Sequence, residues 1–191
     1  MNRRQDAIAS ARRAAKSARR ALSPDYREAA SRVISSRVQR MHEFNACTSL
    51  ACYLPMPDEV DATPVIARAW EMGKRVFAPI IDRNGSMVFS ELTPQTELRQ
   101  NWYGLWEPES GSQIPARELD LVITPLVAFD ENGHRIGMGS AYFDRCFAFL
   151  RNRHRWLRPK LIGTAFNCQQ VEKIKPNPWD IPLYKVVTEH L

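Results

Sequence analysis

The stretch of this 191-residue chain with the most chemical potential is residues 130–145, where one residue separates Gly137 from Gly139. Closely spaced glycines let backbone N–H groups approach an anion, and a helix that starts after such a loop favours negative charge there. Arg135 stands before the glycines and Asp144 follows them. A guanidinium suits phosphate oxygens and a carboxylate suits Mg²⁺. The stretch therefore predicts a phosphate-binding loop.

Neither common nucleotide-binding pattern matches this loop. A Walker loop requires Gly-Lys followed by Ser or Thr, and a dinucleotide fingerprint expects glycine or alanine where Tyr142 stands. A glycine turn that only joins a strand to a helix explains the glycines equally well. The flanking Arg135 and Asp144 favour the ligand-binding interpretation.

Two carboxylates outside the loop are further candidates. Glu59 follows Pro57 and Asp58 and, considered alone, is more simply a turn acid. Asp180 lies close to the carboxyl end, where a lysine a few residues earlier offers a plain ion pair. The residues alone leave both alternatives open.

Three aromatic residues, Trp102, Tyr103 and Trp106, lie in residues 93–118, a stretch rich in Pro, Gly, Gln and Glu. A long irregular stretch inside a compact domain usually forms a functional or covering loop. Its aromatic side chains can form a wall for a flat ring or cover the core. Both interpretations stay open.

The elements that must position these residues alternate between strands and helices after residue 44. Apolar runs bounded by turn residues predict helices at 63–73 and 144–151, and strands at 46–56, 76–81, 87–92, 121–129, 160–166 and 184–188. A strand, a helix and a strand in succession predict a parallel sheet with a right-handed crossover. The almost continuously apolar run 121–129 is typical of a central strand, and open α/β sheets bind ligands at the carboxyl ends of such strands. We expect one α/β domain over residues 1–191.

The first 40 residues carry the positive excess of the chain. They hold 11 of the 27 Lys and Arg residues but only 3 of the 21 Asp and Glu residues, so the remainder is slightly acidic. Two helices are expected in this basic segment, 1–42, packed on the domain: apolar residues recur at helical spacing from Ile8 to Leu22, and Ser23-Pro24-Asp25 is a typical helix start. The apolar face expected on the second helix comprises Tyr26, Ala30, Val33, Ile34, Val38 and Met41.

The basic face of the first helix has several interpretations. It can be a solvated surface, a source of one or two phosphate-binding arginines, or an electrostatic footprint for nucleic acid. Arg-rich starts also occur in organelle transit peptides. The sequence offers no base-reading element, which makes nucleic acid the weakest of the possible partners.

Composition excludes several classes of protein. With 44% apolar and 25% charged residues, the chain can bury a core without disulfides or a structural metal. No apolar run reaches the roughly 18 residues of a membrane span, and no apolar signal segment opens the sequence. The cysteines form no Cys-x-x-Cys pair, which argues against zinc ribbons and thioredoxin-like sites. We therefore expect a cytoplasmic protein with small core thiols at Cys47, Cys52, Cys146 and Cys168.

Several motifs together resemble the 5-formyltetrahydrofolate cyclo-ligase family, also called 5,10-methenyltetrahydrofolate synthetase. The resemblance covers nearly the whole chain and extends to the arginine-rich first helix. The motifs are Tyr53–Val60, Thr124–Asp130, Arg135–Gly139, Tyr142–Arg145, Trp179–Leu183 and Val186–Glu189.

The resemblance implies both a fold and a reaction. The fold is a single-domain, three-layer α/β open sheet, mainly parallel and Rossmann-like, of the NagB/RpiA/CoA-transferase type, with two N-terminal helices. The reaction is the ATP- and Mg²⁺-dependent closure of 5-formyltetrahydrofolate to 5,10-methenyltetrahydrofolate, with release of ADP and phosphate. The formyl oxygen takes the γ-phosphoryl group, and the neighbouring folate nitrogen then attacks the activated carbon. Catalysis of this kind rests on positioning and charge stabilisation.

The resemblance also assigns roles to individual residues. Asp144 and Asp180 would hold Mg²⁺, while Arg135 and Tyr142 would act closest to the reacting groups. The residues that would bind ATP are Arg12, Arg135, Ile136, Gly137, Met138, Gly139, Ser140, Ala141, Tyr142 and Phe143. The residues that would bind the folate are Leu54, Glu59, Met138, Gly139, Ser140, Ala141 and Tyr142.

This chain departs from the family pattern in the glycine loop and in the first helix. Ser140 and Ala141 stand where the family commonly has glycine or lysine and then glycine, and Ile8 stands four residues before Arg12, where a lysine is common. A side chain forced into a positive φ angle costs about 1–3 kcal/mol. The alternative function is therefore that of a non-catalytic or weakly active folate- or nucleotide-binding homologue. For either function we expect a monomer or a weak homodimer without membrane contact.

Overall fold

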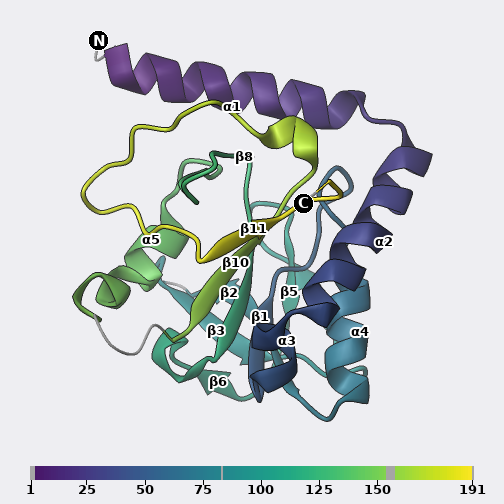
Figure 1. The fold of residues 1–191 in the computed structure, drawn as a ribbon. Helices are drawn as coiled ribbons and strands as arrows, with labels where there is room; N and C mark the ends of the chain where they lie inside the picture. Colours follow the sequence, from purple (N-terminus) through teal and green to yellow (C-terminus); the bar gives the residue numbers. More distant parts are fainter. Residues whose placement is uncertain (1–2, 83, 154–157, 191) are drawn as a thin grey trace.

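The computed structural model describes residues 3–82, 84–153 and 158–190, and a seven-stranded sheet lies at its centre (Figure 1). Its strands are β1 (Ser49–Cys52), β2 (Arg75–Ile81), β3 (Met87–Glu91), β6 (Gln113–Ile114), β7 (Leu121–Pro125), β10 (Lys160–Thr164) and β11 (Lys185–Val187). Their spatial order is β11–β10–β7–β1–β2–β3–β6. The first five strands in that order are parallel, and β3 and β6 each run antiparallel to the strand before. The expected α/β class with a mainly parallel sheet is confirmed.

Helices cover both faces of the sheet and complete three layers (Figure 1). On one face lie α2 (Pro24–Arg40), α3 (His42–Ala46) and α4 (Thr63–Glu71), and on the other lie α5 (Tyr142–Cys146) and the 3-10 turn η2 (Ala148–Asn152). Because side chains alternate along a strand, Leu121 and Ile123 of β7 pack under α2–α4, whereas Val122 packs under α5. The prediction of a central strand buried on both faces is confirmed.

The β1–α4–β2 unit matches the predicted strand–helix–strand arrangement, because α4 connects two strands that pair in parallel. The start predicted for the second helix is also confirmed: the Ser23 hydroxyl accepts a hydrogen bond from the Tyr26 N–H at 3.2 Å. Its apolar face is narrower than expected, since Tyr26 and Val33 are exposed.

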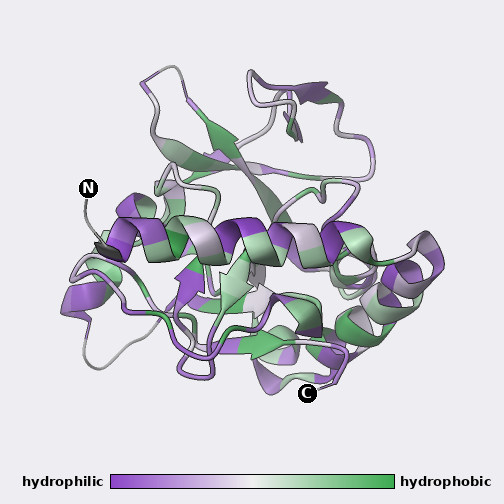
Figure 2. Cartoon of the chain, turned by 90° about the horizontal axis from the view of Figure 1, so that it is seen from above, coloured by the Kyte–Doolittle hydropathy of each residue, from purple (hydrophilic) through white to green (hydrophobic). Residues whose placement is uncertain are grey.

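Helix α1 (Arg3–Ala21) crosses the top of the molecule with hydrophilic and hydrophobic residues interleaved along it (Figure 2). Ile8, Ala11 and Ala15 pack against a small hairpin formed by β8 (Ala128–Phe129) and β9 (Arg135–Ile136). The apolar spacing read from the sequence is therefore the face that docks α1. Over the described residues, no helix has the length and apolar character needed to span a membrane.

Several predicted boundaries differ from the structure. The run 121–129 is divided, because β7 ends at Pro125, which has no N–H to donate, and the chain turns into β8. The region 93–118 contains a hairpin of β4 (Leu98–Gln100) and β5 (Trp106–Pro108), followed by β6 and the 3-10 turn η1 (Ala116–Glu118).

Two further predicted elements are shorter than expected. The strand predicted at 46–56 is confined to β1, because Ala46 ends α3. The helix predicted at 144–151 starts earlier, at Tyr142, and gives way to η2 after Cys146.

The cysteines divide between core and surface. Cys47 and Cys52 are buried as expected, Cys146 is partly exposed and Cys168 is exposed. The expectation of a core thiol is wrong for Cys168, because it lies on the outer side of the short 3-10 turn η3 (Asn167–Gln169), whose Gln169 points inward.

Candidate active site

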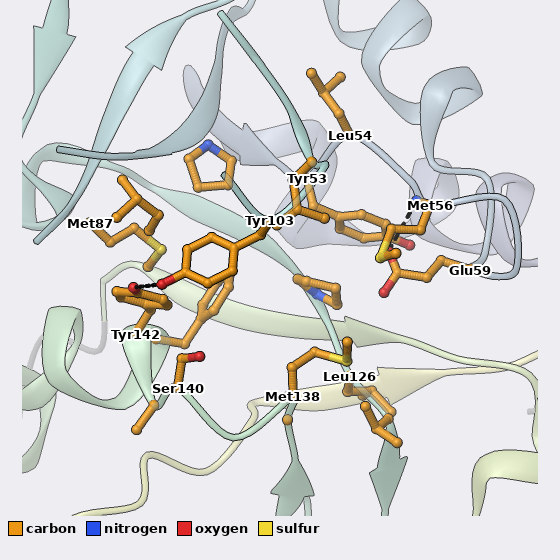
Figure 3. A pocket seen from close by; sticks show the side chains of 18 of the residues that line it. Tyr53, Leu54, Met56, Glu59, Met87, Tyr103, Leu126, Met138, Ser140 and Tyr142 are labelled. Atoms are coloured by element: carbon orange, nitrogen blue, oxygen red, sulfur yellow. Dashed lines mark hydrogen bonds between the residues drawn. The ribbon is translucent and has the colours of Figure 1, made fainter. Parts of the chain in front are cut away.

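A cavity of about 330 Å³ lies at the carboxyl ends of β1, β2 and β7 (Figure 3). Four stretches of chain contribute walls: residues 53–59 after β1, the end of β2 with the start of β3, the β4–β5 hairpin, and residues 125–144. Open α/β sheets bind ligands at this edge. The glycine loop and Glu59, which are far apart in the sequence, therefore share one cavity.

The glycine loop lines the cavity through Gly137, Met138, Ser140 and Ala141. Two guanidinium groups hold its carbonyls. Arg12 Nε donates to the Gly137 oxygen at 2.8 Å, and an Nη of Arg145 donates to the Ser140 oxygen at 2.6 Å. The Arg12 side chain thus lies against the loop, as the phosphate-binding interpretation of α1 requires.

Ala141 holds a left-handed backbone conformation with φ 51°, immediately before α5. In the described part of the chain it is the only residue other than glycine with a positive φ. Ser140 has no such strain. The expected cost of replacing glycine in this loop therefore falls on one of the two substituted positions.

Arg135 is nearly buried and forms an ion pair with Asp144 at 2.7 Å. It also donates to the Ile181 carbonyl, while the Ile181 N–H donates to Asp144 Oδ1 at 3.1 Å. Burial lowers the pKa of Arg135, and the charges of Asp144 and Asp180 act in the opposite direction. The guanidinium is thus fixed at the cavity wall, in contact with the segment that carries Asp180.

The two carboxylates expected to hold a metal differ in their surroundings. Asp144 lines the cavity, and its Oδ2 accepts no hydrogen bond from any described residue. Asp180 lies outside the lining, and its Oδ2 accepts the Asn177 N–H at 2.8 Å. No group of three metal-binding side chains occurs among the described residues. Hard oxygen donors in this number suit Mg²⁺, which takes one or two carboxylates and completes its shell with phosphate and water.

Leu54 and Glu59 line the cavity, and Figure 3 shows the Glu59 carboxylate pointing toward its interior. Glu59 Oε2 accepts the Met56 N–H at 3.2 Å, so the residue is a turn acid and a wall residue at once. Burial raises the pKa of Glu59, and the nearby Arg19 guanidinium opposes this rise. Arg19 is a residue that sequence reasoning missed.

The β4–β5 hairpin supplies an aromatic wall. Tyr103 and Trp106 line the cavity, whereas Trp102 is fully exposed, so the wall interpretation holds for two of the three residues. The Tyr103 and Tyr142 hydroxyl oxygens lie 2.8 Å apart, and this hydrogen bond is the main cause of a raised pKa of Tyr142 (Figure 3). The hairpin is thereby joined to the end of the glycine loop.

The hairpin also contributes residues that the sequence did not single out. Asn101 lines the cavity, and its side-chain amide donates to Glu107 Oε2 at 3.1 Å. Glu107 is buried and pairs with Arg99 at 3.2 Å. The strands β4 and β5 have only three residues each, so the alternation of their side chains is too short to predict from the sequence that Asn101 and Arg99 meet Glu107.

The remaining candidates have mixed positions. Phe143 lines the cavity. Ile136 is buried under α1, and Gly139 lies in the loop without lining the cavity. The structure therefore gathers most of the candidate residues around one cavity and leaves four of them, Arg12, Ile136, Gly139 and Asp180, outside its lining.

Residues 4–189 match the sequence model of one protein family, the 5-formyltetrahydrofolate cyclo-ligase family. The chain belongs to that family. It is 37% identical over 175 residues to the 5-formyltetrahydrofolate cyclo-ligase of Escherichia coli K12, which covers 89% of this chain and 93% of that protein. The enzyme of the same name from Haemophilus influenzae is 32% identical over 158 residues, which covers 81% of this chain and 82% of its own.

Solved structures of cyclo-ligase relatives share the fold. The NMR structure of Aquifex aeolicus 5,10-methenyltetrahydrofolate synthetase superposes with a TM-score of 0.81 at 28% identity, covering 95% of this chain and 89% of that one. The Mycoplasma pneumoniae synthetase gives 0.75 at 20% identity, covering 95% and 98%, and supports the fold alone. The resemblance inferred from the motifs is confirmed, and the family is one of enzymes.

Proposed function

We propose that this chain uses ATP and Mg²⁺ to convert 5-formyltetrahydrofolate into 5,10-methenyltetrahydrofolate, ADP and phosphate. The observation that carries the proposal is the single cavity that the glycine loop shares with Glu59, in a chain of the cyclo-ligase family. One half of that cavity offers phosphate-binding groups, and the other offers apolar walls and a carboxylate. The two halves can therefore bind two substrates side by side in one cavity.

The triphosphate is assigned to the glycine-loop half. Backbone N–H groups of residues 137–141, together with the guanidinium groups of Arg12 and Arg135, are suited to phosphate oxygens. Asp144 and Asp180 are the residues assigned to Mg²⁺, which when bound would offset charge on the β- and γ-phosphates. The chain's own contribution is a set of fixed donors beside the transferring group.

The folate is assigned to the half formed by Leu54, Glu59 and the β4–β5 hairpin. The ionised Glu59 carboxylate can accept hydrogen bonds from the donor-rich edge of the pterin ring. Leu54, Tyr103 and Trp106 provide apolar and aromatic surface for its flat rings. This orientation directs the formyl group toward the glycine loop.

The reaction then needs no protein nucleophile. The formyl oxygen attacks the γ-phosphorus as the bond to the ADP oxygen breaks, and the formyl carbon becomes electrophilic. The adjacent folate nitrogen attacks that carbon, loses its proton, and phosphate departs with the former formyl oxygen. Arg135 and the Tyr142 hydroxyl, whose residues line the cavity, are assigned to stabilise charge at the transferring group.

The direct test mixes purified protein with ATP, Mg²⁺ and 5-formyltetrahydrofolate and follows the absorbance of the methenyl product. Turnover that requires all three supports the proposal, and Glu59→Gln should lower kcat/KM for the folate. The matched control is Glu71→Gln, on the exposed face of α4. Calorimetric titration with each substrate separates the alternative: binding of both without product would identify a non-catalytic homologue, and binding of neither would refute the proposal.

A further inference from the structure

Arg19 of α1 is a nearly fully buried guanidinium placed beside the carboxylate that lines the folate half of the cavity. Its side chain is 3% exposed. Nη2 lies 2.9 Å from Asp58 Oδ2, and Nε donates to the same oxygen at 3.3 Å. Nη1 lies 3.6 Å from Glu59 Oε1. The next residue, Arg20, is 69% exposed, and its Nε lies 3.5 Å from Asp58 Oδ2.

A buried charge is tolerated only where it is paired and hydrogen-bonded. The ion pair with Asp58 already neutralises the charge of Arg19, so neutralising Arg19 does not require its second contact, with Glu59. We propose that Arg19 is a positioning residue that keeps Glu59 ionised and oriented for folate binding. This inference rests on the proposed function, because it assumes that Glu59 contacts the folate.

The charged and titratable groups around Glu59 come from two directions. Arg19 and Lys16 approach it from α1, Asp58 adjoins it in the same turn, and Tyr53 lies near it from the end of β1. Burial favours the neutral acid, and Arg19 is the largest influence in favour of the carboxylate. A protonated Glu59 would present an O–H where the pterin edge needs an acceptor.

The same helix serves the opposite half of the cavity through Arg12. Arg12 and Arg19 are seven positions apart in α1, which is about two helical turns and 10 Å along the axis, so both project from one face of the helix. Arg12 holds the Gly137 carbonyl, and Arg19 holds the 57–59 turn. Loss of Arg19 should therefore act on the folate and leave ATP binding to Arg12 and the loop.

The experiment titrates 5-formyltetrahydrofolate without ATP from pH 6 to 9, into wild type, Arg19→Gln, Arg19→Lys and the matched control Arg20→Gln. For Arg19→Gln we expect at least tenfold weaker folate binding at pH 7, a loss that shrinks as the pH rises, and an ATP affinity within twofold of wild type. Arg20→Gln should stay within twofold for both ligands. Arg19→Lys should lose about threefold, because an ammonium retains charge without the two-sided contact.

A double-variant cycle distinguishes positioning from mere support. In a Glu59→Gln background, Arg19→Gln should weaken folate binding by less than twofold further. An equal loss in that background, or a loss that does not depend on pH, would overturn the inference. If Arg19→Gln does not fold, Arg19→Lys decides: wild-type folate affinity and pH dependence in that variant would also overturn it.

Failure of this inference can be told apart from failure of the proposed function. Wild type that binds no folate, or Glu59→Gln that binds it as wild type does, contradicts the placement of the folate itself. Glu59→Gln that binds folate weakly beside an unaffected Arg19→Gln contradicts only the role given to Arg19.

Discussion

Of the two loop residues that depart from the family pattern, Ala141 is the one with a strained, positive φ angle. A left-handed alanine costs about 1–2 kcal/mol, and glycine relieves this at a smaller entropic cost. We expect Ala141→Gly to raise the free energy of unfolding by up to about 1 kcal/mol in urea titrations and to raise turnover with ATP. Ser140→Gly, which relieves no positive φ, is the matched control and should be neutral or slightly destabilising. Equal effects of both changes would show that the loop is not strained at Ala141.

Asp144 Oδ1 accepts hydrogen bonds from both Arg135 and the Ile181 N–H. Asp144→Asn should reduce Mg²⁺-dependent turnover by about 100-fold, because the proposed metal ligand loses its charge and buried Arg135 loses its ionic partner. Folate affinity, measured by titration without ATP, should change by less than twofold. Asp25→Asn, exposed at the start of α2, controls for loss of negative charge. Parallel losses in turnover and folate binding would mean that Asp144 has only a structural role.

At the scale of elements, the β4–β5 hairpin closes one side of the cavity through a single side-chain hydrogen bond. Tyr103→Phe removes the bond to Tyr142 while keeping the ring that lines the wall. We expect KM for 5-formyltetrahydrofolate to rise about three- to tenfold, since one neutral hydrogen bond contributes about 0.5–1.5 kcal/mol. Trp102→Ala, at the exposed tip of the same hairpin, should leave steady-state kinetics unchanged. An unchanged KM in Tyr103→Phe would contradict the closing role.

Strands and helices with long apolar runs could be predicted from the sequence. Short strands that are held in place by contacts with distant parts of the chain could not. Residues 121–123 and 161–163 carry no polar side chain because both faces of their strands are buried, and that cause can be read from the sequence. The three residues of β4 are all exposed, so no buried pattern marks the strand. The β8–β9 hairpin is equally short and depends on α1 for its cover.

The candidate site divides in the same way. The glycines with Arg135 and Asp144 could be found because they form a local motif. Arg19 could not, because Arg20 beside it is the same residue type, and only the fold brings one of them against a turn 39 residues away. Burial of a charged side chain is a tertiary property with no local signal.

At the scale of the whole molecule, a hydrogen-bonded cluster around Glu43 joins α3 to β10 and to the residue before β11. Glu43 accepts hydrogen bonds from Lys160 at 3.0 Å and from the Tyr184 hydroxyl at 2.9 Å. Burial acts to raise its pKa, but hydrogen bonds from its backbone N–H, Lys160 and Tyr184 lower the pKa from 4.5 to about 2. A lowered folded-state pKa stabilises the fold above the unfolded pKa, and that contribution disappears as the pH falls toward 2.

We therefore expect wild type to lose on the order of 1 kcal/mol more stability than Glu43→Gln between pH 5 and pH 2.5. Urea denaturation at several pH values measures the difference. Glu71→Gln, on an exposed helix face, is the control and should follow wild type. Identical pH dependence of wild type and Glu43→Gln would show that this cluster does not govern acid unfolding.

The docking of α1 has a consequence for the order of events during synthesis. Helix α1 is synthesised before the segments it contacts: Arg12 bonds to the Gly137 carbonyl 125 residues later, and Ile8, Ala11 and Ala15 pack against the 127–136 hairpin. Contacts of such long sequence separation slow folding. The apolar face of α1 consequently stays uncovered until the 127–136 hairpin has been synthesised and folded.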